Sequence, residues 1–237
     1  MVTRLAPRRW AGQMTGSRKA GMTRTAAEKK PARWADAVPA REAQYESKRR
    51  ALVREAARAF GRRGFHNTSL EEIAETLGVT KPALYRYVRT KHEILFEAKS
   101  IAFDAGARAR EMAAEGSQDP LERLRLYIVH YIDLVTSELG SYAVLAEPVT
   151  SLPPEYAEPI RARMREADRA LRAMVQAAME AGAMPQGDPR LAVAFFMGAI
   201  NHIARWYTPE GSLSGRQIGE IFAGFVLNGL RGPAPPG

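Results

Sequence analysis

The sequence predicts an all-α protein with an N-terminal three-helix helix-turn-helix domain at residues 41–90 and a larger C-terminal helical domain at residues 91–237. Two observations lead to this fold class. From Arg41 onward, apolar residues recur at the spacing of an amphipathic helix, and capping residues and glycines separate the elements. Near the C-terminus, two segments are apolar on nearly all faces, which indicates helices that are covered on several sides.

The chain has 237 residues and a net charge of +9, and the basic excess lies in its N-terminal third. Residues 1–40 carry a net charge of +7 and residues 41–90 one of +5, whereas residues 91–237 carry −3. A polyanionic partner is therefore expected on the N-terminal side. The absence of cysteine excludes disulfides and thiolate metal sites, and no apolar run reaches the roughly 18 residues of a membrane span. We expect a cytoplasmic protein.

Residues 1–40 are rich in Arg, Lys, Ala, Gly and Thr and show no apolar period, which predicts a disordered basic tail. Two interpretations stay open. The tail is either a basic arm that binds phosphates or a loose extension, in which case Met14 or Met22 is the true start.

The helix-turn-helix domain is expected to contain three helices. The first carries an apolar stripe and ends at Gly64. The second is expected to open with Thr68 as its N-cap and with Glu71 three residues later, which is the spacing of a capping box, and to stop at Gly78. Only two residues further on, Thr80 can cap a third helix that has a proline in its first turn.

The third helix is barely two turns long, so it is stable only when it packs against its neighbours. Leu84 and Val88, four residues apart, are expected to face that small core. The remaining side chains then face outward, and they are donors or flat groups that suit a phosphate-lined groove: Lys81, Pro82, Ala83, Tyr85, Arg86 and Tyr87. A helix, a short turn and a second helix of this kind form a helix-turn-helix.

The segment GFHNTSLEEIAETLGVTKPALYRYVRTKHEIL, residues 64–95, resembles the DNA-binding domain of the TetR family of bacterial repressors. The capping residues, the glycine turn, the LYxY pattern and the lysine that follows all fall in order. The resemblance implies that the third helix enters the major groove of double-stranded DNA. It also implies that two copies of the chain read a palindrome.

The resemblance and the residue types together give ten candidate DNA-contacting residues. Lys81 is the candidate for base readout, because a basic side chain at the start of a recognition helix can reach guanine O6 and N7. Thr68 either contacts a phosphate or only caps its helix, Tyr87 contacts a phosphate or packs, and Lys91 contacts a phosphate or is a solvated surface lysine. The full set is Thr68, Ser69, Thr80, Lys81, Pro82, Ala83, Tyr85, Arg86, Tyr87 and Lys91.

The C-terminal domain is expected to open with a long helix that begins near Thr90, followed by helices separated by the breakers GSQDP, EP, LPP and GAMPQGDP. One helix is expected at about residues 155–181, and two strongly apolar helices follow it. Since the helix near Thr90 joins both domains, its tilt is the expected lever by which a ligand changes the spacing of the recognition helices.

The last two helices are expected to form the interface of a homodimer. Phe195, Phe196, Met197 and Ile200 cover too much of one helix for a single buried stripe. Two helices from each subunit would form a four-helix bundle, and the alternative is a monomer with a thick core. Glycines in these helices would let backbones approach closely: Gly198, Gly219 and Gly224.

The segment RWYTPEGSLS, residues 205–214, is similar to a joint in the branch of the TetR family that controls fatty-acid and steroid breakdown through acyl-CoA ligands. That resemblance implies an amphipathic, polyanionic effector, which needs an apolar cavity with cations at its mouth. The candidates for the cavity are Phe103, Tyr127, Tyr131, Met164, Phe195 and Met197, and those for phosphate or adenine contacts are Arg172, His202, Arg205 and Trp206. For each of these, an ordinary core or ion-pair role is the alternative.

The sequence predicts no enzyme and no cofactor. Its four histidines are scattered, and it has no HExxH, no GxSxG and no P-loop. The favoured function is a dimeric, ligand-responsive repressor that binds a palindromic operator. The alternative is an all-α lipid- or acyl-binding module whose basic N-terminal third faces a membrane or another acidic surface.

Overall fold

The computed structural model describes residues 37–139 and 142–230. Within these ranges the chain forms eight α-helices and three short 3₁₀ helices, and it has no strand. The all-α prediction is therefore confirmed. The tail predicted for residues 1–40 lies outside the described residues, except for the last four, which are helical.

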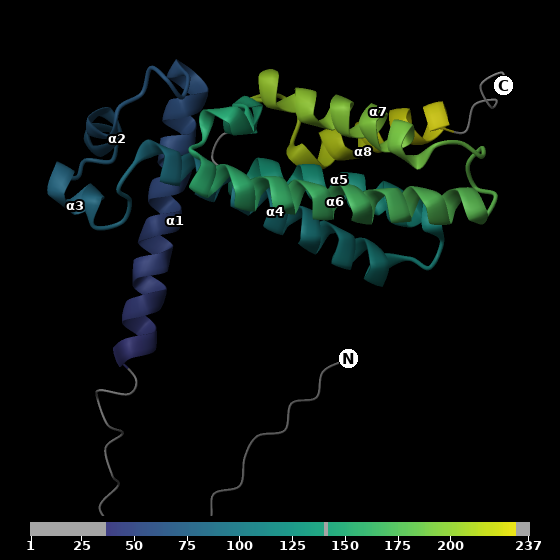
Figure 1. Ribbon diagram of the computed structural model, residues 1–237, viewed down its shortest axis with the longest axis horizontal. Helices are drawn as coiled ribbons and strands as arrows, with labels where there is room; N and C mark the ends of the chain where they lie inside the picture. Colours follow the sequence, from purple (N-terminus) through teal and green to yellow (C-terminus); the bar gives the residue numbers. More distant parts are fainter. Residues whose placement is uncertain (1–36, 140–141, 231–237) are drawn as a thin grey trace, which may run out of the picture. The chain divides into compact units, whose positions relative to one another are not determined.

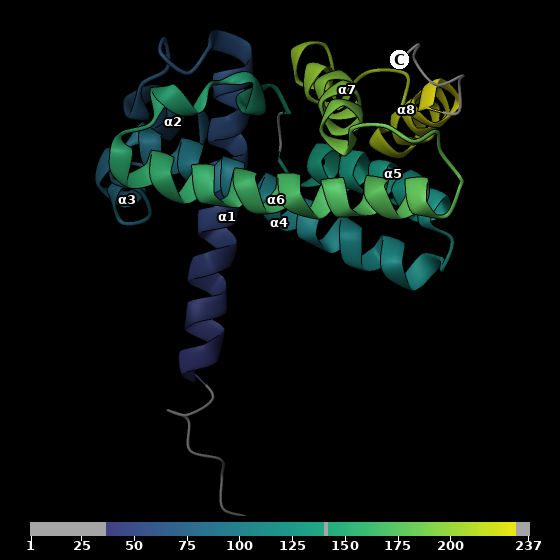
Figure 2. The same ribbon diagram turned by 45° about the vertical axis from the view of Figure 1, so that its right-hand side comes forward.

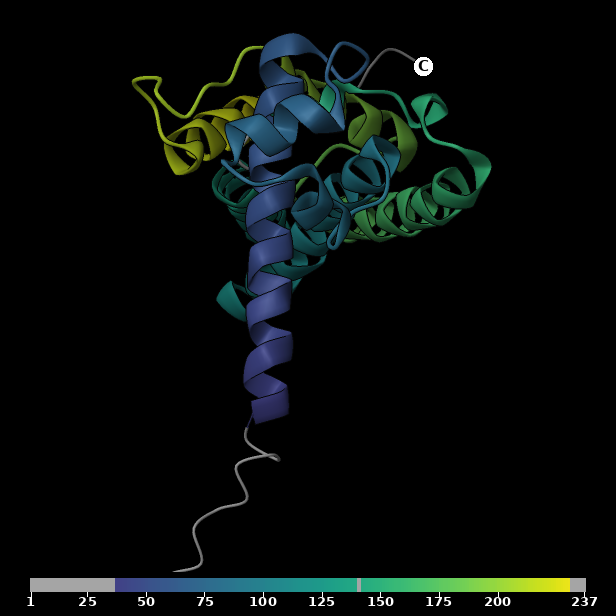
Figure 3. The ribbon, with the colours of Figure 1, turned by 90° about the vertical axis from the view of Figure 1, so that its left-hand side faces the viewer.

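The first three helices are α1 (Ala37–Arg63), α2 (Leu70–Thr76) and α3 (Lys81–Tyr85). Apolar side chains from all three are buried together, among them Phe60, Ile73 and Leu84, and Leu84 is 0% exposed. Figure 3 shows the two short helices beside α1, in blue. Since α3 has only five residues, it depends on this packing for its stability. We call α1–α3 the head.

The remaining five helices are all longer than α2 and α3, and they pack side by side (Figures 1 and 2). Helix α4 packs against α5 and α6, α5 also packs against α8, and α6 packs against α7. Their bounds are Lys91–Gly116 for α4, Pro120–Glu138 for α5, Pro154–Glu180 for α6, Pro189–His202 for α7 and Gly215–Leu230 for α8. The 3₁₀ helices are η1 (Tyr142–Ala146), η2 (Val149–Ser151) and η3 (Ile203–Arg205).

Helix α4 buries a row of small side chains along most of its length. The row comprises Ala98, Ala102, Ala105, Gly106, Ala109 and Ala113. A methyl group or a hydrogen at each position lets neighbouring helices approach α4 closely. One long polar side chain interrupts the row, since Lys99 is 6% exposed.

One of the three glycines predicted to allow close backbone approach does so within the described chain. A Cβ atom added to Gly219 of α8 would lie 2.9 Å from Val129 Cα and 3.0 Å from Val129 O on α5. A Cβ atom added to Gly198 or to Gly224 would meet nothing within 4 Å. Close approach within the chain is therefore confirmed for Gly219 only.

Helices α7 and α8 leave large apolar side chains uncovered. Leu191 is 71% exposed, Phe195 56%, Ile221 42% and Phe225 70%. Phe196, next to Phe195, is 0% exposed and belongs to the core. The two helices therefore carry an inner apolar face, which the chain itself covers, and an outer one, which it does not.

Candidate DNA-contacting surface and effector cavity

Four of the six side chains predicted to face outward from the third helix are exposed. Lys81, Pro82, Tyr85 and Arg86 are exposed, whereas Leu84 is fully buried. Helix α3 begins as predicted, because the Thr80 hydroxyl accepts a hydrogen bond of 3.4 Å from the Ala83 amide. Ala83 is half-buried. The start of α3 thus presents one cation and two small groups to the surroundings.

The N-cap of α2 is Ser69, and the prediction that it is Thr68 was wrong. The Ser69 hydroxyl accepts from the Glu72 amide at 3.2 Å, and Glu72 Oε2 accepts from the Ser69 amide at 2.8 Å, which completes a capping box. Thr68 is 2% exposed, and its hydroxyl donates to the Gly64 carbonyl at 2.9 Å. Burial and this internal bond remove Thr68 from the surface that could contact a phosphate.

Lys81, the candidate for base readout, is paired with an acid of α2. Its ammonium forms an ion pair with Glu71 and lies 5.9 Å from the centre of the Tyr85 ring. The hydrogen bond raises the pKa of Lys81 and lowers that of Glu71. Because both side chains are about half-exposed, Lys81 can exchange this partner for another acceptor at little cost.

Tyr87 packs inside the head, which decides between the two roles left open for it. Its ring stacks on Tyr45 of α1, with the ring centres 5.0 Å apart. The Tyr45 hydroxyl donates to the Arg86 carbonyl at 3.1 Å. Arg49, also on α1, donates to the Tyr87 carbonyl at 3.4 Å and pairs with Glu97 of α4 at 2.8 Å. These contacts fix the end of the recognition segment to both α1 and α4.

Lys91, the first residue of α4, holds the loop between α1 and α2. Its Nζ donates to the carbonyls of Phe65 at 3.0 Å, His66 at 3.1 Å and Thr68 at 3.4 Å. The ammonium also lies 4.8 Å from the centre of the Phe65 ring. A primary ammonium has three hydrogens, so these three carbonyls engage all of them. Neither predicted role, a phosphate contact or a solvated lysine, describes this internal arrangement.

A cavity of about 980 Å³ lies among α4, α5, α6, α7 and the segment that contains η1 and η2. Buried side chains form its inner wall, among them Ala102 on α4 and Ile160 and Leu171 on α6. Exposed residues that also line it, such as Met164 and Leu191, mark its opening between α6 and α7. The volume is within the range of sites for cofactor-sized ligands.

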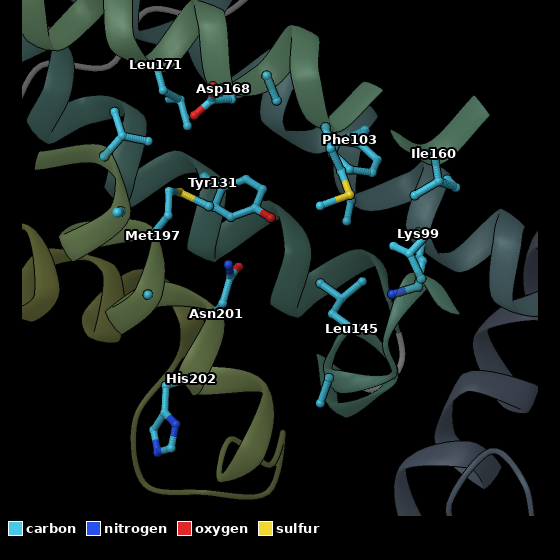
Figure 4. Close-up of a pocket in the computed structure, with 18 of the residues that line it drawn as sticks. Lys99, Phe103, Tyr131, Leu145, Ile160, Asp168, Leu171, Met197, Asn201 and His202 are labelled. Atoms are coloured by element: carbon cyan, nitrogen blue, oxygen red, sulfur yellow. The ribbon is translucent and has the colours of Figure 1, made fainter. Parts of the chain in front are cut away.

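Seven of the ten residues predicted for the ligand site line this cavity: Phe103, Tyr131, Met164, Arg172, Met197, His202 and Arg205. In Figure 4, Met197 points toward Tyr131, whereas the His202 ring is directed away from the other labelled side chains. The Arg172 guanidinium pairs with Asp168 at 2.6 Å, and its Nε is buried without a hydrogen-bond partner in the described chain.

The other three predicted residues do not line the cavity. Tyr127 lies one helical turn before Tyr131 and is 2% exposed, and the two rings stack with their centres 5.7 Å apart. Burial raises the pKa of Tyr127, which therefore stays a neutral phenol and packs behind Tyr131. Phe195 points out of the chain on α7, and Trp206 is half-exposed beside Phe222. The structure therefore does not support the cavity assignment of Tyr127 and Phe195, whereas the adenine contact predicted for Trp206 stays a prediction.

The sequence interpretation missed the buried cation of the cavity, Lys99. Its Nζ donates a hydrogen bond of 2.7 Å to the Glu147 carbonyl, in the turn between η1 and η2. Burial lowers the pKa of Lys99 to about 8, although the charge of Glu147 acts in the opposite direction. Figure 4 shows its nitrogen beside Leu145, with the Tyr131 hydroxyl and the Asn201 amide on the other walls. Arg190, another cation missed, pairs with Asp188 at 2.6 Å.

The same Glu147 connects the cavity with the head. One of its carboxylate oxygens, Oε1, lies 3.2 Å from Nε2 of His66, in the loop between α1 and α2. The Ser151 hydroxyl donates to the same oxygen. The His66 carbonyl in turn accepts from Lys91. A continuous path of polar contacts therefore runs from the cavity wall to the loop that precedes α2.

An outward recognition helix and a ligand-sized cavity, joined by α4, define a ligand-responsive DNA-binding regulator. Two family models agree with this class. Residues 52–98 match the model of bacterial regulatory proteins of the TetR family, and residues 117–230 match that of the tetracycline-repressor-like C-terminal domain. The chain belongs to the TetR family of transcriptional regulators.

The chain resembles several relatives over nearly their whole length. The chain is 28% identical over 192 residues to the transcriptional repressor KstR2 of Mycobacterium tuberculosis, which covers 79% of this chain and 94% of that protein. It is 28% identical to the TetR-family regulator PfmR of Thermus thermophilus, with a TM-score of 0.68 over 76% of this chain and 98% of the other. It is 29% identical to AibR, whose structure was solved with isovaleryl coenzyme A and operator DNA, with a TM-score of 0.63 over 75% and 96%.

These relatives do not favour the alternative of a lipid-binding module with a basic surface, because both family models and the named relatives are transcriptional regulators. None of the helices in the described part of the chain is long and apolar enough to cross a membrane. Over the same residues, no group of three or more histidine, aspartate or glutamate side chains is arranged to hold a metal ion.

Proposed function

We propose that this chain is a homodimeric repressor that binds a palindromic operator through α3, and that an acyl-CoA-type effector in the cavity releases it. The observation that carries this proposal is the position of α4. Its first residue, Lys91, holds the loop before α2, and Lys99, two turns further on, lines the cavity. A ligand that displaces α4 therefore also acts on the head.

The proposed DNA contacts come from exposed and half-buried side chains of the head. Lys81 would read a base, and Pro82 and Ala83 would approach the groove closely. The phosphate backbone of the DNA would be contacted by Tyr85, Arg86 and the hydroxyls of Ser69 and Thr80. Such contacts position α3 but do not read the base sequence. In this proposal the DNA-binding domain comprises residues 41–90, and residues 91–237 contain the cavity and the dimer interface.

The proposed dimer interface is the outer apolar face of α7 and α8. Phe195 and Phe225 are more than half-exposed, and Gly224, next to Phe225, has no neighbour in its own chain that a Cβ atom would meet. An open glycine beside an exposed aromatic ring suits the close approach of a helix from a second copy. Two heads held in this way would reach half-sites about one helical turn of DNA apart.

The proposed effector is an acyl thioester of coenzyme A. The cavity provides an apolar interior for an acyl chain, and Arg172, Arg190 and Arg205 are the cations among its lining residues nearest to solvent. Phosphate groups favour guanidinium partners. The related AibR was crystallised with a thioester of this class, which supports the proposal. No part of the proposal requires catalysis.

Fluorescence anisotropy tests the function directly. The labelled duplex is a palindrome from the region upstream of the coding sequence, and the control is a scrambled duplex of the same composition. We expect binding tighter for the palindrome by a factor of about 10³ or more at physiological salt, and release when an acyl-CoA is added. Equal affinity for both duplexes at every salt concentration would contradict the proposal.

Analytical ultracentrifugation tests the dimer. Phe225→Glu should yield monomers at micromolar concentration, because it places a charge in the centre of an apolar interface. The matched control is Met112→Glu, which changes another exposed apolar side chain, 40% exposed, on α4. The control should remain dimeric. A Phe225→Glu protein that sediments as a dimer would exclude this interface.

A further inference from the structure

Lys99 is a buried cation whose hydrogen-bonding capacity is largely unused. An ammonium has three hydrogens to donate. Within the described residues, Nζ makes one hydrogen bond, at 2.7 Å to the Glu147 carbonyl, and no ion pair. The residue is 6% exposed, and it lines the cavity. Two of the three donors thus have no acceptor in the described part of the chain, on a side chain that lines the cavity.

The acids around the cavity have other cationic partners. Asp168 pairs with Arg172 and Asp188 with Arg190, both at 2.6 Å. The carboxylate of Glu147 lies against His66 and Ser151. The charge of Lys99 is therefore not neutralised by a direct contact within the described chain.

The wall around Lys99 is otherwise apolar. Ala102, Phe103, Leu145 and Ile160 line the same cavity, and Figure 4 shows the latter three around the Lys99 side chain. An effector with a hydrocarbon end at this position would separate the ammonium from water and offer it no acceptor, which is costly. An effector that ends in a carboxylate would accept both free donors and neutralise the charge.

We infer that Lys99 determines effector specificity, and that the preferred effectors are acyl thioesters whose buried end bears a carboxylate. The inference rests on the proposed function, since it deepens the identity of the ligand in the same cavity. It places the anionic head of the ligand at the exposed arginines and a second anionic group on the cavity floor. A neutral keto oxygen would accept one hydrogen bond but add no negative charge to that of Glu147, which offsets the burial of the ammonium only in part.

Isothermal titration calorimetry with two series of thioesters tests this inference. The first series is glutaryl-, adipyl- and suberyl-CoA, which end in a carboxylate. The second replaces each terminal carboxylate by an isopropyl group of the same shape. For the chain length that fits, we expect the wild-type protein to bind the carboxylate-ended thioester at least about tenfold more tightly, the size of one buried charge-assisted hydrogen bond.

Two variants and a control show whether Lys99 causes the preference. Lys99→Met, which keeps the length of the side chain and removes its charge, should abolish the preference or reverse it. Lys99→Arg should keep it. Lys48→Met removes one positive charge from the exposed surface of α1 and should leave it unchanged, which controls for long-range attraction of the anionic ligand.

The outcomes separate this inference from the proposed function. A wild-type protein that binds both series equally, or a Lys99→Met variant that keeps the wild-type preference, would overturn the role of Lys99 and leave the thioester class intact. If neither series binds a protein that still recognises its operator, the thioester class is wrong and the inference falls with it, whereas the DNA-binding function stands.

Discussion

His66 of the head and Glu147 of the cavity wall lie 3.2 Å apart, between Nε2 of one and Oε1 of the other. The backbone carbonyl of the same Glu147 accepts the hydrogen bond of Lys99. A ligand that draws Lys99 away from this carbonyl therefore acts on a residue that touches the loop before α2. This provides a route between the two sites in addition to α4 itself.

His66→Ala should weaken the coupling between effector and operator and leave each binding step nearly intact. The His66 side chain is 73% exposed, so we expect the contact to contribute at most ~1 kcal/mol, or a two- to fivefold smaller effect of the effector on DNA affinity. The measurement is the dissociation constant for operator with and without saturating effector. Arg161→Ala, which removes the exposed Arg161–Glu158 pair of α6, is the control. Unchanged coupling in His66→Ala would exclude this route.

Glu71→Gln should increase the affinity for operator because it releases Lys81 from its ion pair. We expect a two- to fivefold gain, about what an exposed pair contributes, and a sharper preference for guanine at the base that Lys81 reads. Glu75→Gln removes the same charge from α2 and is the control, since any general gain from lower negative charge appears in both. If Glu71→Gln and Glu75→Gln gave the same gain in affinity and neither changed the base preference, Lys81 would not read a base.

Lys91→Met should lower the stability of the head, and its effect should not be limited to a lower affinity for DNA. It removes the donor of three hydrogen bonds to backbone carbonyls, which we expect to cost about 1–3 kcal/mol in the free energy of unfolding. Urea denaturation monitored by circular dichroism measures this. Wild-type stability combined with a salt dependence of DNA binding reduced by about one unit would instead assign Lys91 to a phosphate contact.

Lys99→Met should stabilise the protein at pH 7 by about 2 kcal/mol. The pKa of Lys99 is about 8 in the folded chain against 10.5 ordinarily, so protonation at pH 7 opposes folding by on the order of 3 kcal/mol, from which the lost hydrogen bond subtracts about 1 kcal/mol. Between pH 8 and 10.5 the unfolded chain binds more protons, so wild-type stability rises with pH and the advantage of the variant shrinks. Urea denaturation of both proteins at pH 7 and pH 10 checks this. A difference that does not change with pH would contradict it.

Gly219→Ala should lower the free energy of unfolding by about 1–3 kcal/mol, because its Cβ atom would meet backbone atoms of Val129 that cannot move independently. Gly224→Ala, on the same helix, meets nothing within 4 Å of its own chain, so in the monomeric Phe225→Glu background it should be neutral or stabilising by up to ~1 kcal/mol. Thermal denaturation of the two variants side by side makes the comparison. Equal effects would mean that the close contact between α5 and α8 is absent.

The three helices of the head could be predicted from the sequence because their signals are local, but the N-cap residue of α2 could not. Thr68 has Glu71 three residues later and Ser69 has Glu72, so the spacing of a capping box fits both pairs. The choice depends on the bond from the Thr68 hydroxyl to the carbonyl of Gly64 at the end of α1. That bond follows from how α1 ends, which spacing within α2 does not encode.

The cavity could be predicted only in part, for two physical reasons. Helix α7 is apolar around most of its circumference, so periodicity could not decide that Phe196 faces inward and Phe195 outward. Lys99 did carry a signal, because it lies four residues after Leu95 and three before Ala102, both buried. A charged residue in line with an apolar stripe indicates a buried cation, whereas its partner Glu147 lies 48 residues away and could not be inferred from spacing.

The row of alanines along α4 also affects how easily this helix moves. Short methyl groups interlock less deeply with neighbouring helices than leucine or isoleucine side chains would. A small slide or rotation of α4 against α5 and α6 would therefore cost less packing energy than it would with longer side chains. The polar attachments of α4, such as those of Lys91 and Lys99, then contribute a larger share of the energy that holds the helix in position.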